Sequence, residues 1–340
     1  MLKLKVKTST KYQITITCGL DNFNQSIDKY IKGDKVAIIT DSNVNKIYGN
    51  LLEEKLLNKK VYTYVVPSGE NSKSKDQYFS LLEKLCADGF TRHDTIIAFG
   101  GGVVGDLSGF VASTYMRGIS FIQVPTTILS AVDSSVGGKT AINLENGKNL
   151  VGAFYQPKAV YVNTDFFKTL PERELKSGFG EIIKYALLDK SVTPDLVKNG
   201  ISEELIYKCL RIKRDIVNKD EKESNLRALL NLGHTVGHAI ESLSNYQISH
   251  GDCVVKGLIY TLKISRRVFD LTQTQIDKIN QIINCYNHDI GCDYSVEQIM
   301  DKVCFDKKGD GKAVKFVLLK DVGKPEITKL TYQQIKECIK

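Results

Sequence analysis

The chain contains no tryptophan and only five histidines, and its eight cysteines include no CxxC pair. The missing CxxC argues against a zinc ribbon or a dithiol redox site. No apolar run approaches the roughly 20 residues that cross a bilayer. The first ten residues, MLKLKVKTST, alternate apolar and basic positions and lack the apolar core of a signal peptide. We therefore expect a cytoplasmic protein with reduced thiols and no membrane partner.

A long run of like charge is also missing. The 47 basic and 39 acidic residues are spread along the chain, for a net charge of +8. Without a basic arm, we expect no nucleic-acid partner, and the modest excess suits a small anionic substrate. The 340 residues are enough for two domains, and the 42% of hydrophobic residues indicates a folded globular chain.

The two halves of the sequence differ in hydrophobic period. Residues 2–7 and 12–18 alternate as an amphipathic hairpin would. Short β-branched runs, typical of buried parallel strands, occupy residues 35–40, 61–66, 95–100, 119–124 and 159–163. A helical pattern covers residues 76–89, and after about residue 170 helical patterns cover residues 171–188, 203–220, 228–243 and 253–269. These patterns predict an α/β, Rossmann-like N-terminal domain over residues 1–170 and an all-α C-terminal domain over residues 171–340.

A glycine-rich segment follows the predicted strand TIIAF. Gly100, Gly102 and Gly105 satisfy the GxGxxG spacing, which suits a dinucleotide pyrophosphate at a helix N-terminus. The usual fingerprint also requires an acidic residue about 20 positions later, and ISFIQV offers none. Asp41, at the end of an earlier strand, could bind the ribose instead. A tight turn with close helix packing explains the glycines equally well.

Three of the five histidines, His234, His238 and His250, fall close together in the sequence. His234 and His238 are four residues apart on a predicted helix, so spacing alone predicts that both bind one metal ion. Glu181 or Glu241 could supply a carboxylate ligand, and spacing does not decide between them. The alternative is a set of ordinary core or surface histidines.

Several cations lie beside glycines or near these candidate ligands. Arg117 precedes Gly118, Lys139 follows two glycines, and Lys148 with Asn149 follows another. Further cations on predicted helices are Lys184, Lys213 and Arg227. Each alone could be a solvated surface charge, but together they favour a phosphorylated or carboxylated substrate.

These segments together resemble the 3-dehydroquinate synthase family of sugar-phosphate cyclases. The resemblance is carried, in order over residues 95–251, by GGGVVGDLSGF, YMRGISFIQVPTTILSAVDSSVGGKTAIN, GKNLVGAFYQP, GEIIKY and LNLGHTVGHAIE. PSGENSK extends it upstream, and DKK followed by FVLL extends it downstream. It implies an NAD-binding N-terminal domain and a metal- and substrate-binding C-terminal domain. It also implies one divalent ion, zinc or cobalt, and a homodimer.

The resemblance assigns roles residue by residue. The implied metal ligands are Glu181, His234 and His250, which replaces the pair suggested by spacing and makes His238 face the substrate. The implied NAD contacts are Asp41, Ser68, Gly69, Glu70, Asn71, Ser72, Lys73, Gly102, Val103, Val104, Gly105, Asp106, Thr126, Thr127, Lys139, Lys148, Phe166, Phe167, Lys168 and Thr169. The implied catalytic and substrate contacts are Arg117, Asp133, Lys139, Asn149, Lys184, Lys213, Arg227, Asn231 and His238. Lys307 or Lys308 would complete the phosphate pocket.

The implied activity is a lyase reaction of the shikimate pathway, which leads to the aromatic amino acids. A phosphorylated keto acid, 3-deoxy-D-arabino-heptulosonate 7-phosphate, would become 3-dehydroquinate and phosphate. NAD would transiently oxidise the C5 hydroxyl, phosphate would leave by elimination, and the returned hydride would precede an intramolecular aldol step. Two alternatives share the architecture: a cyclase for another sugar phosphate and a metal-dependent polyol dehydrogenase of the glycerol-dehydrogenase type.

Overall fold

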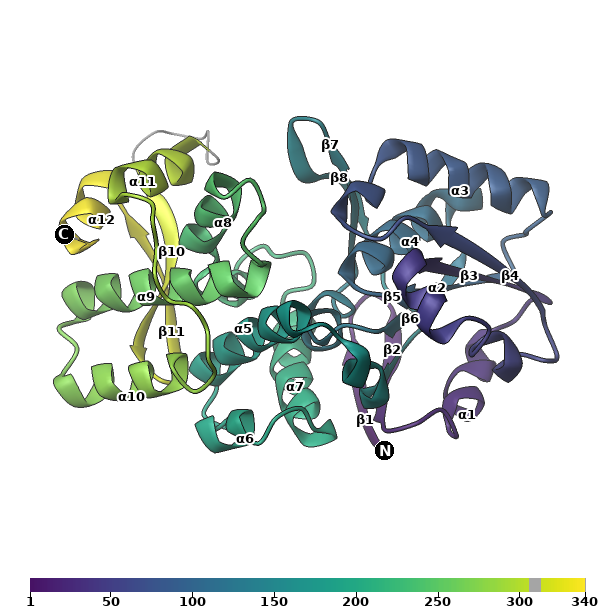
Figure 1. The fold of residues 1–340 in the computed structure, drawn as a ribbon, viewed down its shortest axis with the longest axis horizontal. Helices are drawn as coiled ribbons and strands as arrows, with labels where there is room; N and C mark the ends of the chain where they lie inside the picture. Colours follow the sequence, from purple (N-terminus) through teal and green to yellow (C-terminus); the bar gives the residue numbers. More distant parts are fainter. Residues whose placement is uncertain (306–312, 340) are drawn as a thin grey trace. The chain divides into compact units, whose positions relative to one another are not determined.

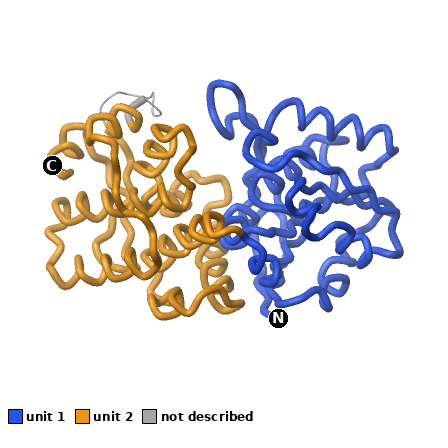
Figure 2. The backbone as a smooth tube through the Cα atoms, viewed as in Figure 1, with its two compact units in different colours: residues 1–170 blue, residues 171–340 orange. Residues whose placement is uncertain are grey.

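The computed structural model describes residues 1–305 and 313–339. The chain divides into two compact units, residues 1–170 (unit 1) and residues 171–340 (unit 2), which Figure 2 shows in different colours. Lys307 and Lys308 lie outside the described residues.

Unit 1 is built on a seven-stranded sheet with the order β1-β2-β9-β6-β5-β3-β4 (Figure 1). The strands are β1 (Leu2–Lys7), β2 (Lys11–Thr17), β3 (Lys35–Asp41), β4 (Lys60–Val66), β5 (Thr95–Gly100), β6 (Ser120–Pro125) and β9 (Ala159–Asn163). β1 and β2 form the predicted antiparallel hairpin, and the other neighbouring strands are parallel. All residues of β5 and β9 are buried, as expected for strands covered on both faces.

Short helices and turns connect these strands. The α-helices are α1 (Phe23–Ile27), α2 (Ser42–Tyr48), α3 (Lys75–Ala87) and α4 (Gly102–Thr114). The 3₁₀ turns are η1 (Asp28–Tyr30), η2 (Glu53–Lys55), η3 (Glu70–Ser72), η4 (Tyr115–Arg117) and η6 (Thr164–Thr169), and η5 (Ser130–Ser134) is a π-helical turn. Helix α4 packs against α3, β5 and β6, and the side chains between them form one continuous apolar core.

A separate antiparallel hairpin, β7 (Lys139–Leu144) and β8 (Gly147–Phe154), stands outside the main sheet. From the sequence these segments are recognisable only as cations beside glycines, because glycine and charge mask a strand pattern. The hairpin is anchored on α4, where a side chain at Gly109 would lie 2.3 Å from Thr140 Cγ2. Unit 1 therefore carries a projecting element that the hydrophobic pattern did not predict.

The strand order of unit 1 reverses between β3 and β5. From β3 the chain continues outward to β4, whereas from β5 it continues in the opposite direction to β6. The carboxyl ends of β3, at Asp41, and of β5, at Gly100, are therefore neighbours in the sheet. In open parallel sheets such a reversal leaves a crevice in which ligands bind. The predicted α/β fold of this half is confirmed.

Unit 2 is helical, as predicted. Its helices are α5 (Glu172–Leu188), α6 (Pro194–Lys198), α7 (Glu203–Lys219), α8 (His234–Leu243), α9 (His250–Phe269), α10 (Gln273–Ile283), α11 (Val296–Phe305) and α12 (Tyr332–Ile339). One addition to the all-α prediction is an antiparallel strand pair, β10 (Val314–Asp321) and β11 (Lys324–Leu330), which packs on α9. No helix among the described residues combines the length and hydrophobicity that a membrane crossing requires.

The predicted helix over residues 228–243 is too long at its start. Residues Leu226–Asn231 form a 3₁₀ turn, η7, and α8 begins only at His234. Gly233 lies between them with φ of 79°, in the left-handed region that favours glycine. A side chain there would also lie 2.9 Å from the carbonyl oxygen of Val254. The apolar residues keep a helical spacing across Gly233, but the backbone changes direction there, so the helix begins only after it.

Candidate functional site

Three helices of unit 2 meet through glycines. An added side chain at Gly180 on α5 would lie 2.3 Å from the carbonyl oxygen of Gly251 on α9. An added side chain at Gly257 on α9 would lie 1.9 Å from the carbonyl oxygen of Gly233. Backbone therefore contacts backbone at both places, which no residue with a Cβ would permit. Gly180 precedes Glu181, Gly251 follows His250 and Gly233 precedes His234, so the close contacts bring these three side chains together.

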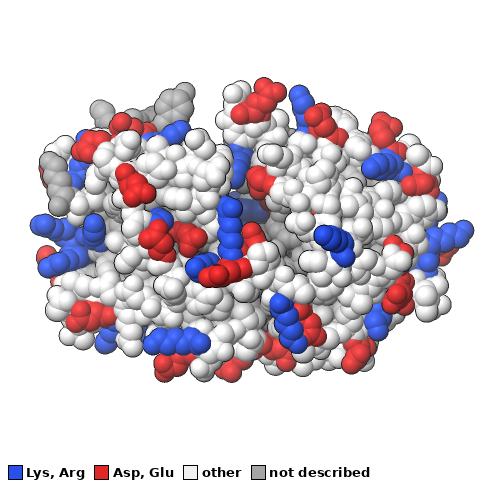
Figure 3. All heavy atoms as spheres, viewed as in Figure 1, with Lys and Arg blue, Asp and Glu red and all other residues white. Residues whose placement is uncertain are grey.

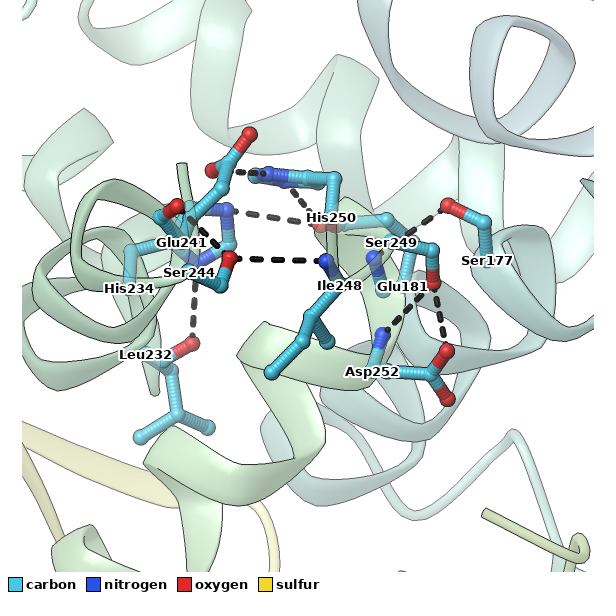
Figure 4. Close-up of polar contacts among 11 residues, drawn as sticks. Ser177, Glu181, Leu232, His234, Glu241, Ser244, Ile248, Ser249, His250 and Asp252 are labelled. Carbon is cyan, nitrogen blue, oxygen red and sulfur yellow. Dashed lines mark hydrogen bonds and ion pairs between the residues drawn. The ribbon is translucent and has the colours of Figure 1, made fainter. Parts of the chain in front are cut away.

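The three side chains converge on one oxygen atom. His234 Nε2 lies 3.3 Å from Glu181 Oε1, and His250 Nε2 lies 3.2 Å from the same atom. Figure 4 shows both imidazoles directed at the Glu181 carboxylate. Glu181 is almost completely buried, with 1% of its side chain exposed. A buried carboxylate requires compensating partners, and here the two imidazoles come from two other helices, α8 and α9.

The atoms of the three proposed ligands that face away from the centre also have polar partners. His234 Nδ1 donates to the carbonyl oxygen of Leu232 at 3.1 Å, and His250 Nδ1 donates to Glu241 Oε2 at 3.1 Å. Because Nδ1 donates outward, both rings direct Nε2 at the centre, and Nε2 is the nitrogen that would bind an ion once it loses its proton. The buried ammonium of Lys184 pairs with Glu181 Oε2, which leaves Oε1 directed at the histidines.

Electrostatics support the same arrangement. Burial opposes ionisation of Glu181, but the positive charges of Lys184 and His234 outweigh it and hold its pKa well below the usual range. Burial lowers the pKa of His250, but the carboxylates of Glu181 and Glu241 reverse this and raise it to about 10. In the absence of an ion the charged carboxylate thus keeps a proton on the nearby imidazole. A cation at the centre would replace that proton.

The donor set fits a divalent ion. A tetrahedral zinc ion with bonds of about 2.0–2.1 Å holds its ligand atoms about 3.3–3.4 Å apart, close to the two distances measured here. A second set is also geometrically available, because ring nitrogens of His234, His238 and His250 lie within 4.8 Å of one another. The structure therefore brings together all the histidines that either prediction requires. His234 and His250 belong to both sets, and Glu181 and His238 distinguish them.

His238 is the exposed member of the group, and its ring centroid lies 5.2 Å from that of His234 and 5.7 Å from that of His250. Desolvation and the two neighbouring imidazoles lower the pKa of His238, so its ring is neutral near pH 7. A neutral, accessible imidazole can accept a proton from a bound molecule and return it.

Other predicted substrate residues of unit 2 are buried cations and their neighbours. Lys184, Lys213 and Arg227 are 1%, 4% and 2% exposed, which is rare for charged side chains unless they bind an anion or a partner. Arg227 is held by Asp220, whose Oδ2 accepts its backbone N–H at 2.9 Å, and by the carbonyl oxygen of Glu221. In contrast to these buried groups, Figure 3 shows acidic and basic side chains interspersed over the visible surface of each unit.

In unit 1 the predicted cofactor residues share one position in the fold: each group follows the carboxyl end of a parallel strand. Asp41 ends β3, residues 68–73 follow β4, residues 102–106 follow β5, Thr126 and Thr127 follow β6, and residues 166–169 follow β9. Only Lys139 and Lys148 lie elsewhere, on the β7–β8 hairpin. The sheet thus brings together five chain segments that are far apart in the sequence.

Contacts between these segments fix the predicted cofactor region. The buried Lys73 ammonium pairs with Asp106 Oδ2 at 2.6 Å, joining the turn after β4 to helix α4. A side chain at Gly105 would lie 2.8 Å from Gln123 Oε1 on β6, so this glycine allows close packing of helix on sheet. Both interpretations of the glycine segment, close packing and an open helix N-terminus, are therefore compatible with the fold.

The remaining predicted substrate residues of unit 1 lie in turns and on the hairpin. Arg117 and Asn149 have φ of 65° and 60°, which is uncommon for residues other than glycine. Asp133 is part of the π-helical turn η5, a form found often at functional sites. Lys139 begins β7 and is exposed.

Two residues that lie against these sites were not predicted from the sequence. Asn143 hydrogen-bonds to Glu70, and Ser134 Oγ would lie 3.2 Å from a side chain at Gly102. A short polar residue in a strand or turn carries no periodic signal, so only the folded structure could identify them.

Comparison with known proteins agrees with the geometry. Family models described as 3-dehydroquinate synthase N-terminal and 3-dehydroquinate synthase C-terminal match residues 63–177 and 178–309. The 3-dehydroquinate synthase of Thermoanaerobacter pseudethanolicus is 40% identical, over 95% of this chain and 94% of its own. That of Clostridium acetobutylicum is 41% identical, over 96% of each chain.

A solved structure extends the likeness to three dimensions. The structure of 2-deoxy-scyllo-inosose synthase complexed with carbaglucose-6-phosphate, NAD+ and Co2+ has a TM-score of 0.89 and 28% identity, over 99% of each chain. The two family models match consecutive parts of the chain in sequence order. The two relatives that are 40% and 41% identical over nearly their whole length are both 3-dehydroquinate synthases. The chain belongs to the 3-dehydroquinate synthase family.

Proposed function

We propose that this chain is a carbon–oxygen lyase that converts 3-deoxy-D-arabino-heptulosonate 7-phosphate into 3-dehydroquinate and phosphate. The observation that carries the proposal is the convergence of His234 Nε2 and His250 Nε2 on the buried Glu181 Oε1, at separations suited to a metal ion. The full-length relatives, which are 40% and 41% identical, carry the same activity. The competing interpretation as a polyol dehydrogenase does not explain the buried cations of unit 2.

Unit 2 would hold the metal ion and unit 1 the NAD. Glu181, His234 and His250 would bind one zinc or cobalt ion, and the related 2-deoxy-scyllo-inosose synthase was solved with NAD+ and Co2+. NAD would lie at the reversal between β3 and β5, with the pyrophosphate near the start of α4 and Asp41 near a ribose. When bound, NAD supplies reversible hydride transfer and the ion supplies Lewis-acid stabilisation of substrate oxygens.

The chain's own residues would bind and orient the substrate. Lys213 and Arg227, buried and cationic, would bind the carboxylate or the leaving phosphate and stabilise the charge that develops on it. His238, neutral and exposed, would move a proton to or from a substrate hydroxyl. Lys184 would keep Glu181 oriented through Oε2 while also contacting substrate. The roles of Arg117, Asp133, Lys139, Asn149 and Asn231 in substrate binding stay predictions of the same kind.

We also propose that the protein works in the cytoplasm as a homodimer. Supporting the location, the cysteines in the described part of the chain are free thiols, as is usual in a reducing compartment. The homodimer stays a prediction from the family resemblance.

Phosphate release tests the proposed function directly. The purified chain with NAD and Co²⁺ should release phosphate from the heptulosonate phosphate with no net formation of NADH, and EDTA should stop the reaction. Phosphate release from glucose 6-phosphate instead would identify another sugar-phosphate cyclase. Steady NADH accumulation with glycerol, without phosphate release, would identify a polyol dehydrogenase. Either result would refute the proposed substrate.

A further inference from the structure

Asn143 on β7 lies at an irregularity of the β7–β8 hairpin. The register of the hairpin shifts between the pairs Ile142↔Val151 and Leu144↔Gly147, so residues 148–150 lie opposite Asn143 alone. Such bulges remove a residue from the regular hydrogen-bond ladder and turn its groups elsewhere. Asn149, in the bulged part of β8, has the left-handed φ of 60°. Both residues are thus in an unusual backbone environment at the same place in the hairpin.

The groups of Asn143 reach two other segments. Its backbone N–H donates to the carbonyl oxygen of Lys73 at 2.7 Å, and its side-chain Nδ2 donates to Glu70 Oε1 at 2.7 Å. Its Oδ1 accepts the backbone N–H of Asn149 at 3.0 Å. The amide orientation is determined by these partners, since a backbone N–H needs an acceptor and a carboxylate needs a donor.

These three hydrogen bonds join segments with different predicted tasks. Glu70 and Lys73 belong to the turn after β4, where the NAD site is proposed, and Lys73 continues the network to Asp106 on α4 at 2.6 Å. Asn149 belongs to the hairpin and is a proposed substrate contact. Among the described residues, Asn143 is the residue whose side chain bonds to both Glu70 and Asn149.

We propose that Asn143 is a positioning residue that links the NAD-binding turn to Asn149, the proposed substrate contact on the β7–β8 hairpin. This inference rests on the proposed function of the two segments. By holding the Glu70 carboxylate and the Asn149 backbone through one planar amide, Asn143 fixes the position of one relative to the other. The Nδ2 arm thus holds the turn for NAD and the Oδ1 arm holds Asn149 for the substrate, so each ligand depends on a different arm of the same amide.

Two substitutions separate the two side-chain bonds. Asn143→Asp keeps an oxygen that accepts the Asn149 N–H but places a second carboxylate against Glu70. Asn143→Ala removes both bonds. Asn146→Ala is the matched control, because Asn146 is an exposed asparagine in the turn of the same hairpin. The readouts are the NAD dissociation constant, measured by calorimetry without substrate, and the KM for the heptulosonate phosphate at saturating NAD.

We expect N143D to weaken NAD binding about tenfold, because it replaces a hydrogen bond to a charged group with a repulsion. N143A should weaken NAD binding less, but should raise the KM roughly threefold, whereas N143D should leave the KM near that of the wild type. A purely structural role would move both quantities in parallel. The inference fails if both variants bind NAD and substrate as N146A does, or if NAD affinity and KM change together in both. A wild-type protein that does not bind NAD would refute the proposed function instead.

Discussion

Gly180 and Gly251 place helices α5 and α9 in direct backbone contact, one residue away from the two proposed metal ligands Glu181 and His250. A Cβ at Gly180 would lie 2.3 Å from Gly251 O, and one at Gly251 would lie 2.0 Å from Ser177 O. The contact is reciprocal, and neither helix can move closer. The geometry of the centre is therefore set by backbone packing as well as by the side chains that line it.

Gly180→Ala should damage the metal centre without changing a ligand. The added methyl group must push α5 from α9, which we expect to cost about 1–3 kcal/mol of unfolding free energy. The same displacement separates Glu181 from His250 and lowers zinc affinity. Urea unfolding of the metal-free protein and zinc titration against a chromophoric chelator measure the two effects. Gly291→Ala, beside the 84% exposed Asp289 side chain, is the control. Wild-type zinc affinity in G180A would refute this account.

The ligand set can be decided by metal content. If Glu181, His234 and His250 bind the ion, His234→Ala and Glu181→Gln should lose metal and turnover together. His238→Ala should retain the metal and lose turnover, because only a proton-moving group is removed. Elemental analysis after dialysis, with phosphate release on the same samples, gives both quantities. Full metal content in E181Q together with loss of metal in H238A would favour the three-histidine set.

Glu241 should raise the affinity for the metal ion without being one of its ligands. Its Oε2 accepts from His250 Nδ1 at 3.1 Å, so removing it frees the ring to rotate and weakens its basicity. We expect Glu241→Ala to lower zinc affinity about 10–100-fold, with Glu241→Gln falling between it and the wild type. Glu172→Ala removes an exposed carboxylate of the same unit and should have no effect. If E241A binds zinc as tightly as E172A, the contact has no role at the centre.

The fold was largely predictable because its signals are local. Runs such as 35–40 and 95–100 differ from the observed strands β3 and β5 by at most one residue, since burial on both faces demands a continuous apolar run. The β7–β8 hairpin escaped prediction because lysines, asparagines and glycines interrupt its pattern. Helix 228–243 was overextended because periodicity does not register the left-handed Gly233.

The site was less predictable, because spacing reports only neighbours on one element. Spacing detected the His234–His238 pair on α8, but Glu181 and His250 are 69 positions apart and meet only through the contact of α5 and α9. Their assignment came from the family resemblance. Glu241 was a candidate ligand from the sequence. In the structure its carboxylate instead accepts a hydrogen bond from His250 Nδ1, the nitrogen that faces away from the centre.

The stability that the loop before Arg227 contributes to the fold depends on pH through the carboxyl group of Asp220. Its carboxylate accepts the backbone N–H groups of Arg227, Asn225 and Ser224, and these bonds, led by that of Arg227, lower its pKa. A carboxyl group with a pKa below its ordinary value of about 3.9 stabilises the fold fully above that value. The contribution is lost as the pH falls through the pKa of the folded state.

Asp220→Asn should therefore destabilise the protein by about 1–3 kcal/mol at pH 7, and the difference from the wild type should shrink as the pH falls below about 4. Urea unfolding at several pH values between 3 and 7 measures the difference. Asp215→Asn, which removes an exposed partner of Arg214, should change stability little at any of these values, because surface ion pairs contribute little. At pH 7, D220N should also raise the KM for the heptulosonate phosphate, since the weakened loop holds Arg227 less firmly. If the loss of unfolding free energy in D220N stayed constant down to pH 3, the charge of Asp220 would not be what orders the loop. The asparagine would then destabilise the protein by disturbing its packing.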